Sequence, residues 1–328
     1  MDRRSTVKLG LAAAVAASGL AGAMPAYAQQ WPTKPLRFIV PYSPGGISDI
    51  AARIVGAKLS DVLKQQVIVD NRPGGNGTIG TAAVAKSPAD GYTWVVATVG
   101  DFTITQHILK KLPYDPLVDL DPVMSLTDTP CVLAVNVNSP YKTVADVLDA
   151  AKKSPGKVSY ATPGVGAINQ LLMEWTANVT GTSFNHIPYK GGAPSGAAVA
   201  AGDVAIGLLA VSSAMPHLKS GKVRMIANTS SKRSPVIPDV PTLRESGVKD
   251  VDGTNYTLIL GPKGTPKAII DEMNVEITKI LNAADVKERL AAGAAVPIPS
   301  TPADLAARLK REAAAFKVIV QKAKISAD

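Results

Sequence analysis

Short runs of β-branched and other apolar residues alternate along the chain with segments whose apolar residues recur every three or four positions. The first pattern is typical of buried strands and the second of helices with one apolar face. The predicted strands are residues 37–40, 67–69, 93–99, 132–137, 158–161, 205–210, 225–228 and 257–260. The predicted helices are residues 50–62 (capped by Ser48 or Asp49), 143–153, 168–179, 266–281 and 302–324 (capped by Thr301).

Strands and helices that alternate at this spacing predict an α/β fold with a mostly parallel sheet. About twelve strand candidates are too many for one small sheet, so we expect two domains with a ligand cleft between them. Pro- and Asp-rich segments at 112–122, 234–241 and 250–254 are possible crossings between the domains. The predicted division is residues 29–130 together with 254–328 in the first domain, and residues 131–253 in the second.

The first 28 residues have the pattern of a secretory signal. Basic Arg3, Arg4 and Lys8 precede an apolar stretch over 9–24, and an A-x-A motif ends at Ala28. The stretch is short and rich in Ala and Gly, which argues against a membrane span. We expect cleavage near Ala28 and a periplasmic mature protein. Both the general secretory and the twin-arginine routes stay open, and the alternative is an amphipathic N-terminal helix of a cytoplasmic protein.

Charge and cysteine content narrow the function further. Removal of the signal takes away three basic residues and one acidic residue, so the net charge falls from +9 to +7. The basic residues form no run of five, and aromatic residues are not interleaved with them, which argues against nucleic-acid binding. The single cysteine, Cys131, lies in an apolar run and is expected to be a small buried hydrophobic residue.

Two Gly-rich turns, at 41–49 and 162–169, each follow a predicted strand and open a predicted helix. Glycines let backbone N–H groups approach a ligand closely, and the helix N-terminus behind them favours an anion. Two such turns that face each other across a cleft could hold both ends of a dianion. The alternative is that each is only a tight strand-to-helix turn.

A third Gly-rich stretch, at 75–80, fits the G-x-G-x-x-G dinucleotide fingerprint, with Asp101 about 20 residues further on. It follows the second predicted strand, and residues 71–73 separate it from that strand, so the tight turn of the fingerprint is lost. We therefore expect no dinucleotide and no other cofactor.

Residue patterns typical of catalysis are missing from the sequence. His107, His186 and His217 are far apart, and there is no H-E-x-x-H, no Cys-rich zinc pattern and no G-x-S-x-G. A triad assembled from distant residues stays possible. Asp49 is the one carboxylate that could either line the cleft or cap a helix.

Several short motifs, in their order and spacing, make the chain resemble the Bug-type (TctC-like) receptors of tripartite tricarboxylate transporters. These motifs are WPTKP at 31–35, PGGISD at 44–49, VDNRPG at 69–74, PADGY at 88–92, HIPYKG at 186–191, PDVPT at 238–242 and GTP at 264–266. The resemblance implies a two-domain, periplasmic-binding-protein-like (Venus flytrap) fold with the ligand between the domains. It also implies a small carboxylate ligand, delivery to a membrane permease and no catalysis, and we expect a monomer without a metal ion.

In the family, the two Gly-rich turns hold the carboxylates mainly through backbone groups and ordered water. Together with neighbouring positions, the expected ligand-binding residues are Tyr42, Ser43, Gly45, Gly46, Ile47, Ser48, Asp49, Thr98, Asp101, Thr162, Gly164, Val165, Gly166, Ala167, Asn169 and Leu208.

This chain departs from the family pattern in the two turns. Family members commonly have Ser or Thr where Ile47 stands, and His near Asn169; Val165 and Ile168 add apolar bulk. We therefore expect a dicarboxylate with an apolar spacer, such as terephthalate or a medium-chain aliphatic diacid, in preference to citrate. The alternative function is an exported enzyme that acts on a carboxylate or a dinucleotide.

Overall fold

The computed structural model describes residues 31–323 and 325–326. The predicted signal at 1–28 and its cleavage site near Ala28 lie outside the described residues. No helix in the described part of the chain is long and apolar enough to cross a membrane. The described residues from Lys34 onward form one unit of mutually contacting elements.

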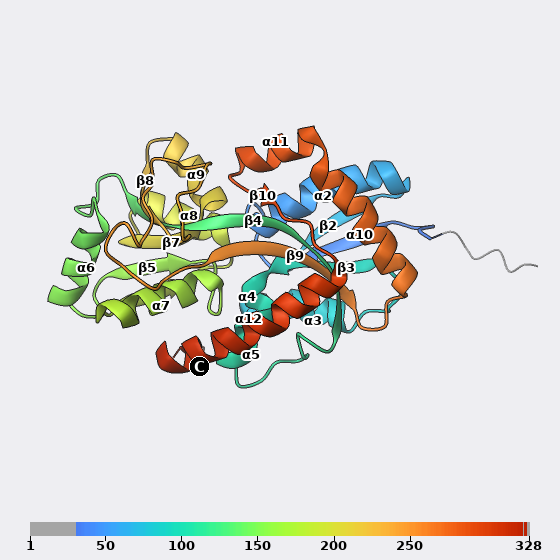
Figure 1. The fold of residues 1–328 in the computed structure, drawn as a ribbon, viewed down its shortest axis with the longest axis horizontal. Helices are drawn as coiled ribbons and strands as arrows, with labels where there is room; N and C mark the ends of the chain where they lie inside the picture. Colours follow the sequence, from blue (N-terminus) through green and yellow to red (C-terminus); the bar gives the residue numbers. More distant parts are fainter. Residues whose placement is uncertain (1–30, 324, 327–328) are drawn as a thin grey trace, which may run out of the picture. The chain divides into compact units, whose positions relative to one another are not determined.

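A sheet of ten strands runs through this unit (Figure 1). Eight strands follow one another in the order β2-β1-β3-β9-β4-β7-β5-β6, and β8 and β10 also pair with β4. The strands are β1 (Leu36–Val40), β2 (Val67–Asn71), β3 (Thr93–Thr98), β4 (Leu120–Asn136), β5 (Ser159–Thr162), β6 (Asn185–Pro188), β7 (Ile206–Ala210), β8 (Val223–Asn228), β9 (Thr254–Pro262) and β10 (Val296–Pro297).

The prediction of a mostly parallel sheet was wrong, because the sheet is mixed. β1 is parallel to β2 and β3, and β5 is parallel to β6 and β7. β9 is antiparallel to β3, and β4 is antiparallel to all of its partners. The parallel pairs come from strand–helix–strand units at the two ends of the sheet, and the antiparallel pairs come from two central strands that run in opposite directions.

β4 is 17 residues long and changes partners along its length. Its first part, up to Pro130, pairs with β9, and its second part, from Cys131, pairs with β7 and β8. The change of partners falls within β4, after the segment at 112–122 that the sequence suggested as a crossing. The predicted boundaries after residues 130 and 253 coincide with this change of partners, although the division into two domains remains a prediction.

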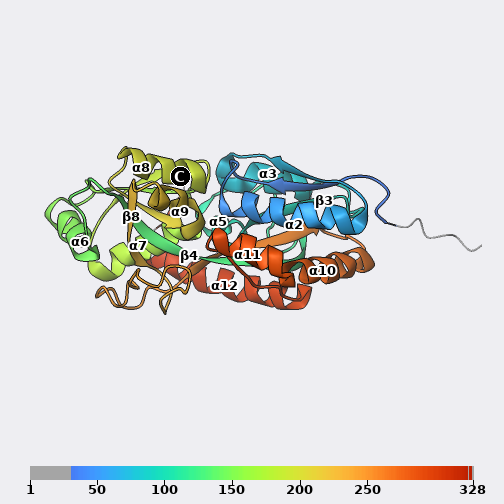
Figure 2. The same ribbon diagram turned by 90° about the horizontal axis from the view of Figure 1, so that it is seen from above.

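Helices cover both faces of the sheet (Figure 2). They are α2 (Ile47–Leu63), α3 (Thr78–Ala85), α4 (Val99–Thr103), α5 (Thr105–Ile108), α6 (Val144–Lys153), α7 (Ile168–Thr180), α8 (Gly192–Ala201), α9 (Val211–Lys219), α10 (Lys267–Asn282), α11 (Ala284–Ala292) and α12 (Pro302–Ala323). All five predicted helices are present. The predicted cap of α12 is confirmed, since Thr301 Oγ1 accepts the backbone N–H of Asp304 at 3.1 Å.

The core contains the apolar faces of these strands and helices. Trp94, Tyr160 and Phe38 are among the largest side chains that are fully buried. Cys131 is also fully buried, as a free thiol within the main apolar cluster, which agrees with its predicted role.

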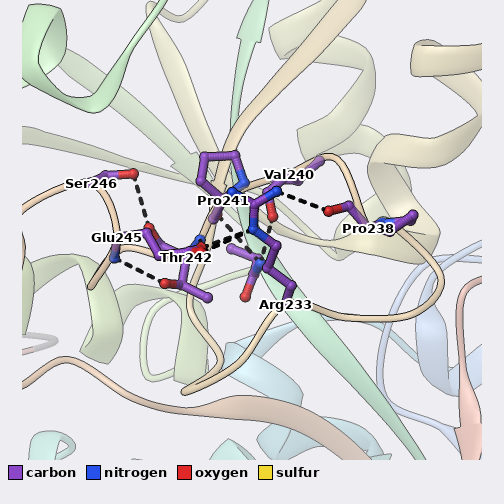
Figure 3. Close-up of polar contacts among 8 residues, drawn as sticks. Arg233, Pro238, Val240, Pro241, Thr242, Glu245 and Ser246 are labelled. Carbon is purple, nitrogen blue, oxygen red and sulfur yellow. Dashed lines mark hydrogen bonds and ion pairs between the residues drawn. The ribbon is translucent and has the colours of Figure 1, made fainter.

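The PDVPT motif at 238–242 lies in a loop that polar contacts hold against β8 (Figure 3). Glu245 accepts the backbone N–H of Thr242 at 2.7 Å and pairs with the guanidinium of Arg233, while Arg233 donates to the carbonyl of Pro238. This motif therefore has a structural role in the loop between β8 and β9.

Candidate functional site

The two Gly-rich turns share one local architecture. Gly45 and Gly166 both adopt a left-handed conformation, with φ of +85° and +78°. Each donates its backbone N–H to a side chain four residues further on, Gly45 to Asp49 Oδ2 at 2.9 Å and Gly166 to Gln170 Oε1 at 2.8 Å. A residue with a side chain rarely adopts this conformation, so glycine is required at both places.

The residues after these glycines, Gly46 and Ala167, are the N-caps of α2 and α7. The prediction that Ser48 or Asp49 caps the first helix was therefore wrong. Both lie inside its first turn, and the carboxylate of Asp49 accepts a hydrogen bond from Gly45 in the turn that precedes the helix. The sequence signal was misleading because the true cap has no side chain.

The N-termini of α2, α4, α7, α8 and α9 border a single cavity, and Thr98 is the N-cap of α4. α2, α7, α8 and α9 have N-cap residues without a side-chain hydrogen bond, namely Gly46, Ala167, Gly191 and Ala210. The empty space among its lining residues is about 360 Å³, which includes space open to solvent. Its lining residues are Tyr42, Gly46, Ile47, Ser48, Thr98, Pro163, Ala167, Asn169, Gly192, Ala210, Ser213 and Asn255. They come from the ends of β3 and β7, from the loops and first helical turns that follow β1, β5, β6 and β7, and from the start of β9, so both ends of the sheet contribute.

Three polar side chains in this lining have an atom without a partner. The hydroxyls of Ser48 and Ser213 and Oδ1 of Asn255 are buried and make no hydrogen bond within the described structure. Asn255 Nδ2 makes only a long contact of 3.5 Å with Asn169. An unpaired buried polar group costs free energy, so a cluster of them around one cavity is typical of a site that receives a polar ligand.

The electrostatics of the cavity favour an anion. No Lys or Arg is among its lining residues, and the positive charge there comes from helix ends. The first N–H groups of a helix have no partner within that helix, and the aligned peptide dipoles make its N-terminus positive. Without side-chain caps, these donors remain available to a carboxylate or another small anion.

Asp49 supports the site from behind instead of lining it. Its carboxylate, only 4% exposed, accepts from Gly45, from Arg53 and, at 3.0 Å, from Asn71 Nδ2. Burial alone would raise its pKa, but the hydrogen bonds from Arg53, Gly45 and Asn71 outweigh burial and lower it. Asn71 also donates to the carbonyl of Tyr42 at 3.0 Å. The VDNRPG motif thus ties β2 to the first turn, a role that sequence reasoning missed.

Asp101 lies behind Tyr42 and Thr98, which both line the cavity. Tyr42 donates its hydroxyl to Asp101 Oδ1 at 2.6 Å, and Thr98 donates its N–H and hydroxyl to Oδ2 at 2.8 and 3.0 Å. Burial raises the pKa of Asp101 to about 6, and the hydrogen bonds from Tyr42 and Thr98 offset only part of that rise. Burial and the nearby Asp101 raise the pKa of Tyr42 well above its usual value, so this phenol stays neutral.

The structure brings together about half of the predicted site residues. Seven line the cavity: Tyr42, Gly46, Ile47, Ser48, Thr98, Ala167 and Asn169. Gly164 lines an adjoining cavity of about 550 Å³, whose wall includes Tyr42, Pro163 and Lys190. Those that line neither cavity are Ser43, Gly45, Asp49, Asp101, Thr162, Val165, Gly166 and Leu208. Contact of any of these residues with a ligand stays a prediction.

Some of these residues are held elsewhere by identifiable contacts. Thr162 Oγ1 lies 2.7 Å from His186 Nε2 and donates to the carbonyl of Gly164 at 3.0 Å. Its hydroxyl therefore helps to fix the conformation of the second turn. Leu208 packs in the core, and Ala210, two residues later, reaches the cavity. Of the three apolar residues expected in the wall, only Ile47 lines it, since Ile168 and Val165 pack in and against the core.

Sequence reasoning missed five lining residues: Pro163, Gly192, Ala210, Ser213 and Asn255. Gly192 was detectable, because a Gly-Gly pair after a strand and before a helix repeats the pattern of the first turn. A methyl group there would overlap the hydroxyl of Ser213, so glycine makes room for that side chain. Asn255 carries no local signal, because it becomes important only when β9 pairs with β4.

The Gly-rich stretch at 75–80 has a different structure from a dinucleotide turn. Residues Gly75–Gly77 form a short 3-10 helix before α3, and Asn76 within it is left-handed. A side chain at Gly77 would overlap Asp101, so this glycine makes space for the carboxylate. In the described part of the chain, no three acidic, His or Cys side chains are grouped as a metal site.

Comparison with known proteins shows the family to which this chain belongs. The family model of the tripartite tricarboxylate transporter family receptor matches residues 51–325. This chain belongs to that receptor family. This chain is 36% identical over 289 residues to the protein BugT of Bordetella pertussis, covering 88% of each, which supports a Bug-type receptor. The predicted α/β fold of the periplasmic-binding-protein type is confirmed by the similarity of this chain to solved periplasmic binding proteins, and the division into two domains stays a prediction.

Two solved structures that resemble this chain contain a carboxylate ligand. This chain matches R. palustris Rpa4515 with adipate at a TM-score of 0.87 and 31% identity, covering 90% of this chain and 99% of the other. It matches MatC from Rhodopseudomonas palustris with bound malate at a TM-score of 0.84 and 27% identity, covering 88% and 100%. These relatives are solute-binding proteins, and the two ligands are those of the relatives.

Proposed function

We propose that this receptor captures a small dicarboxylate with an apolar or aromatic spacer, in the periplasm, and delivers it without chemical change to the permease of a tripartite tricarboxylate transporter. The observation that carries the proposal is the set of four uncapped helix N-termini around one cavity. Unpaired hydroxyls of Ser48 and Ser213 lie at its wall. This arrangement supplies neutral donors for carboxylates at several points of one small space.

The lining of the cavity supports an apolar spacer. Ile47, Pro163, Ala167 and Ala210 present apolar groups between the polar ones. Adipate and terephthalate both have two carboxylates on an apolar spacer, whereas citrate and malate carry a hydroxyl on a short backbone.

The first experiment is calorimetric titration of the mature protein, unfolded and refolded beforehand to remove any captured ligand. The panel is adipate, terephthalate, malate and citrate, with NAD as the dinucleotide control. We expect saturable binding of one diacid with an apolar spacer and, at 100 times its Kd, a stabilisation of about 2.7 kcal/mol. Tighter binding of citrate or malate would refute the apolar spacer, and binding of NAD alone would support the dinucleotide enzyme.

The second experiment separates a receptor from an exported enzyme. After long incubation with the protein, the bound acid is released by denaturation and identified by mass spectrometry. A receptor returns the acid unchanged and in stoichiometric amount. Conversion of the acid to a product would overturn the proposal.

Ser48→Ala and Ser213→Ala test the site itself. Each variant removes a buried hydroxyl that has no partner, so stability should stay the same or rise slightly, while affinity for the diacid falls about tenfold for each lost hydrogen bond. The matched control is Ser60→Ala on the same helix as Ser48. Ser60 bonds to Gly56 and Val67, so this variant should lose stability and keep its affinity. Unchanged affinity in both site variants would contradict the proposed cavity.

A further inference from the structure

Asp101 is a carboxylate buried against the wall of the proposed anion site. It is 2% exposed, and its hydrogen-bond partners among the described residues are the neutral groups of Tyr42 and Thr98. Each of these two partners also lines the cavity. The carboxylate is therefore one residue away from the space in which a ligand carboxylate would sit.

A helix cap alone does not account for this placement. Thr98 and Asp101 form a capping box at α4, and Thr143 and Asp146 form the same box at α6. Asp146 is exposed at the surface, and hydrogen bonds to Lys142 and Thr143 lower its pKa. Asp101 likewise accepts the backbone N–H of its cap residue, but it is buried, and its second oxygen accepts the hydroxyl of Tyr42. The capping box uses only one of the two carboxylate oxygens of Asp101.

Among the described residues, the groups that act on the pKa of Asp101 include no Lys, Arg or His whose positive charge would offset a second anion. The titratable groups that face it are Tyr42, from the loop after β1, and Tyr114, from the segment before β4. Burial is the main cause that raises the pKa of both phenols, so both stay neutral near pH 7. Gly77, from the 3-10 turn, packs against the carboxylate without a side chain.

We propose that binding of a dicarboxylate in this cavity is coupled to the uptake of one proton by Asp101. The proposal rests on the proposed function. Two carboxylates that share a poorly solvated site repel each other, and the system relieves this repulsion when one of them is protonated. The proton comes from bulk solvent and adds to the Asp101 carboxylate as the ligand enters as a dianion. The Tyr42 and Thr98 contacts then hold a neutral acid behind the ligand.

The coupling has a definite sign. A ligand that raises the pKa of Asp101 binds more tightly when this residue is already protonated, so affinity falls as pH rises through the interval between the free and bound pKa values. Each pKa unit of rise on binding corresponds to a factor of about ten in Kd across that interval. We expect about a tenfold weaker Kd at pH 8 than at pH 6 for a diacid that is fully ionised over most of this range.

The test is calorimetric titration of the refolded protein with adipate, or with terephthalate if adipate does not bind, at pH 6.0, 7.0 and 8.0. Each titration is repeated in buffers of different ionisation enthalpy, which gives the number of protons taken up. Wild type should take up a fraction of one proton near pH 7. Asp101→Asn should take up none and lose the pH dependence of Kd, and the matched capping-box variant Asp146→Asn should behave as wild type.

Three results would refute either the coupling of binding to proton uptake or the proposed function on which it rests. Saturable binding without proton uptake refutes the coupling and leaves the proposed function intact. Proton uptake that persists in Asp101→Asn assigns the proton to another group. Absence of binding by every diacid refutes the proposed function, and the coupling with it. If Asp101→Asn does not fold, difference infrared spectra of wild type with and without carboxyl-labelled diacid report whether a protein carboxylate becomes protonated.

Discussion

At the residue scale, the two Gly-rich turns depend on a backbone shape that only glycine adopts easily. Gly166 is left-handed, and a methyl group there would also overlap the side chain of Ile108. Gly181, at the end of α7, is left-handed too, but a methyl group there would meet nothing within 4 Å. Alanine variants at these two positions therefore distinguish the cost of backbone strain from the cost of steric overlap.

We expect Gly181→Ala to lose about 1–2 kcal/mol of stability from backbone strain alone and to keep its ligand affinity. Gly166→Ala should lose more stability and also weaken binding, because the overlap with Ile108 displaces the turn that begins α7. Urea unfolding and titration with the diacid measure the two effects. Equal losses in both variants would show that the turn at 166 tolerates a side chain as well as an open helix end does.

Asp49 gives a second prediction at this scale. Asp49→Ala leaves the N–H of Gly45 without its acceptor and removes one of the two acceptors of the Asn71 amide, so we expect a loss of about 2–3 kcal/mol in the free energy of unfolding. Because Asp49 does not line the cavity, affinity should change less than stability. Asp61→Ala, at an exposed position of the same helix, is the control and should be nearly neutral. A large loss of affinity with normal stability would place Asp49 in contact with the ligand.

At the scale of elements, a small group of polar contacts joins α12 to the central strand β9. Tyr256 of β9 donates its hydroxyl to Glu312 at 2.6 Å, and the guanidinium of Arg308 lies 3.6 Å from the centre of the Tyr256 ring. Arg308 also pairs with Glu312 along the helix at 2.8 Å. These contacts join the C-terminal helix to the strand that pairs with both β3 and β4.

Tyr256→Phe removes the hydroxyl and keeps the ring under Arg308. We expect a loss of about 1–2 kcal/mol, because the lost bond has a charged acceptor that remains partly buried. Thermal unfolding measures this loss. Tyr256→Leu, which also removes the ring, should cost more; if both variants lost the same amount, the contact with Arg308 would contribute nothing.

Elements also show how far the sequence could predict the structure. Helices that start at a side-chain cap, such as Thr143 or Thr301, could be located from the sequence because the signal is local. Helices that face the cavity start at Gly or Ala, so their N-termini gave no such signal. The direction of β9 depends on pairs such as Val95 with Leu260, which are far apart in the chain, and no local pattern reports it.

The same holds for the candidate site: residues with a local sequence signal could be predicted, and residues brought there by contacts between distant segments could not. The two turns were predicted because glycines and helix starts are adjacent in sequence. Ser213 and Asn255 were missed because α9 and β9 reach the cavity only through the packing of the whole sheet. The apolar wall was predicted in part, since residue type could not show that Ile168 faces the core and Ile47 the cavity.

At the scale of the whole molecule, stability should depend on pH through His186. Burial lowers the pKa of this imidazole to about 4, below its ordinary value of 6.5. The folded state therefore keeps it neutral while the unfolded state takes up a proton. The contribution of His186 to stability is complete above about pH 6.5 and is lost as pH falls through about 4.

We therefore expect wild type to lose more stability than His186→Gln when the pH falls from 7.5 to 5.0. A glutamine can keep a hydrogen bond to Thr162, and the contribution of Asp101 is common to both proteins, so the difference isolates the imidazole. Urea unfolding at the two pH values gives the comparison. Parallel pH profiles would mean that His186 titrates alike in the folded and unfolded states.

The change of partners along β4 has a consequence for how this protein can be rebuilt. Pro130 and Thr254 face each other across the β4–β9 ladder, so the chain leaves and returns at neighbouring points. Opposed residues of antiparallel strands lie about 5 Å apart, a gap that a two-residue hairpin turn can close. If residues 131–253 form the predicted second domain, they are an insertion into a hairpin, and we expect that they can be exchanged for the matching segment of a relative while the pairing of β4 with β9 before Pro130 keeps its register.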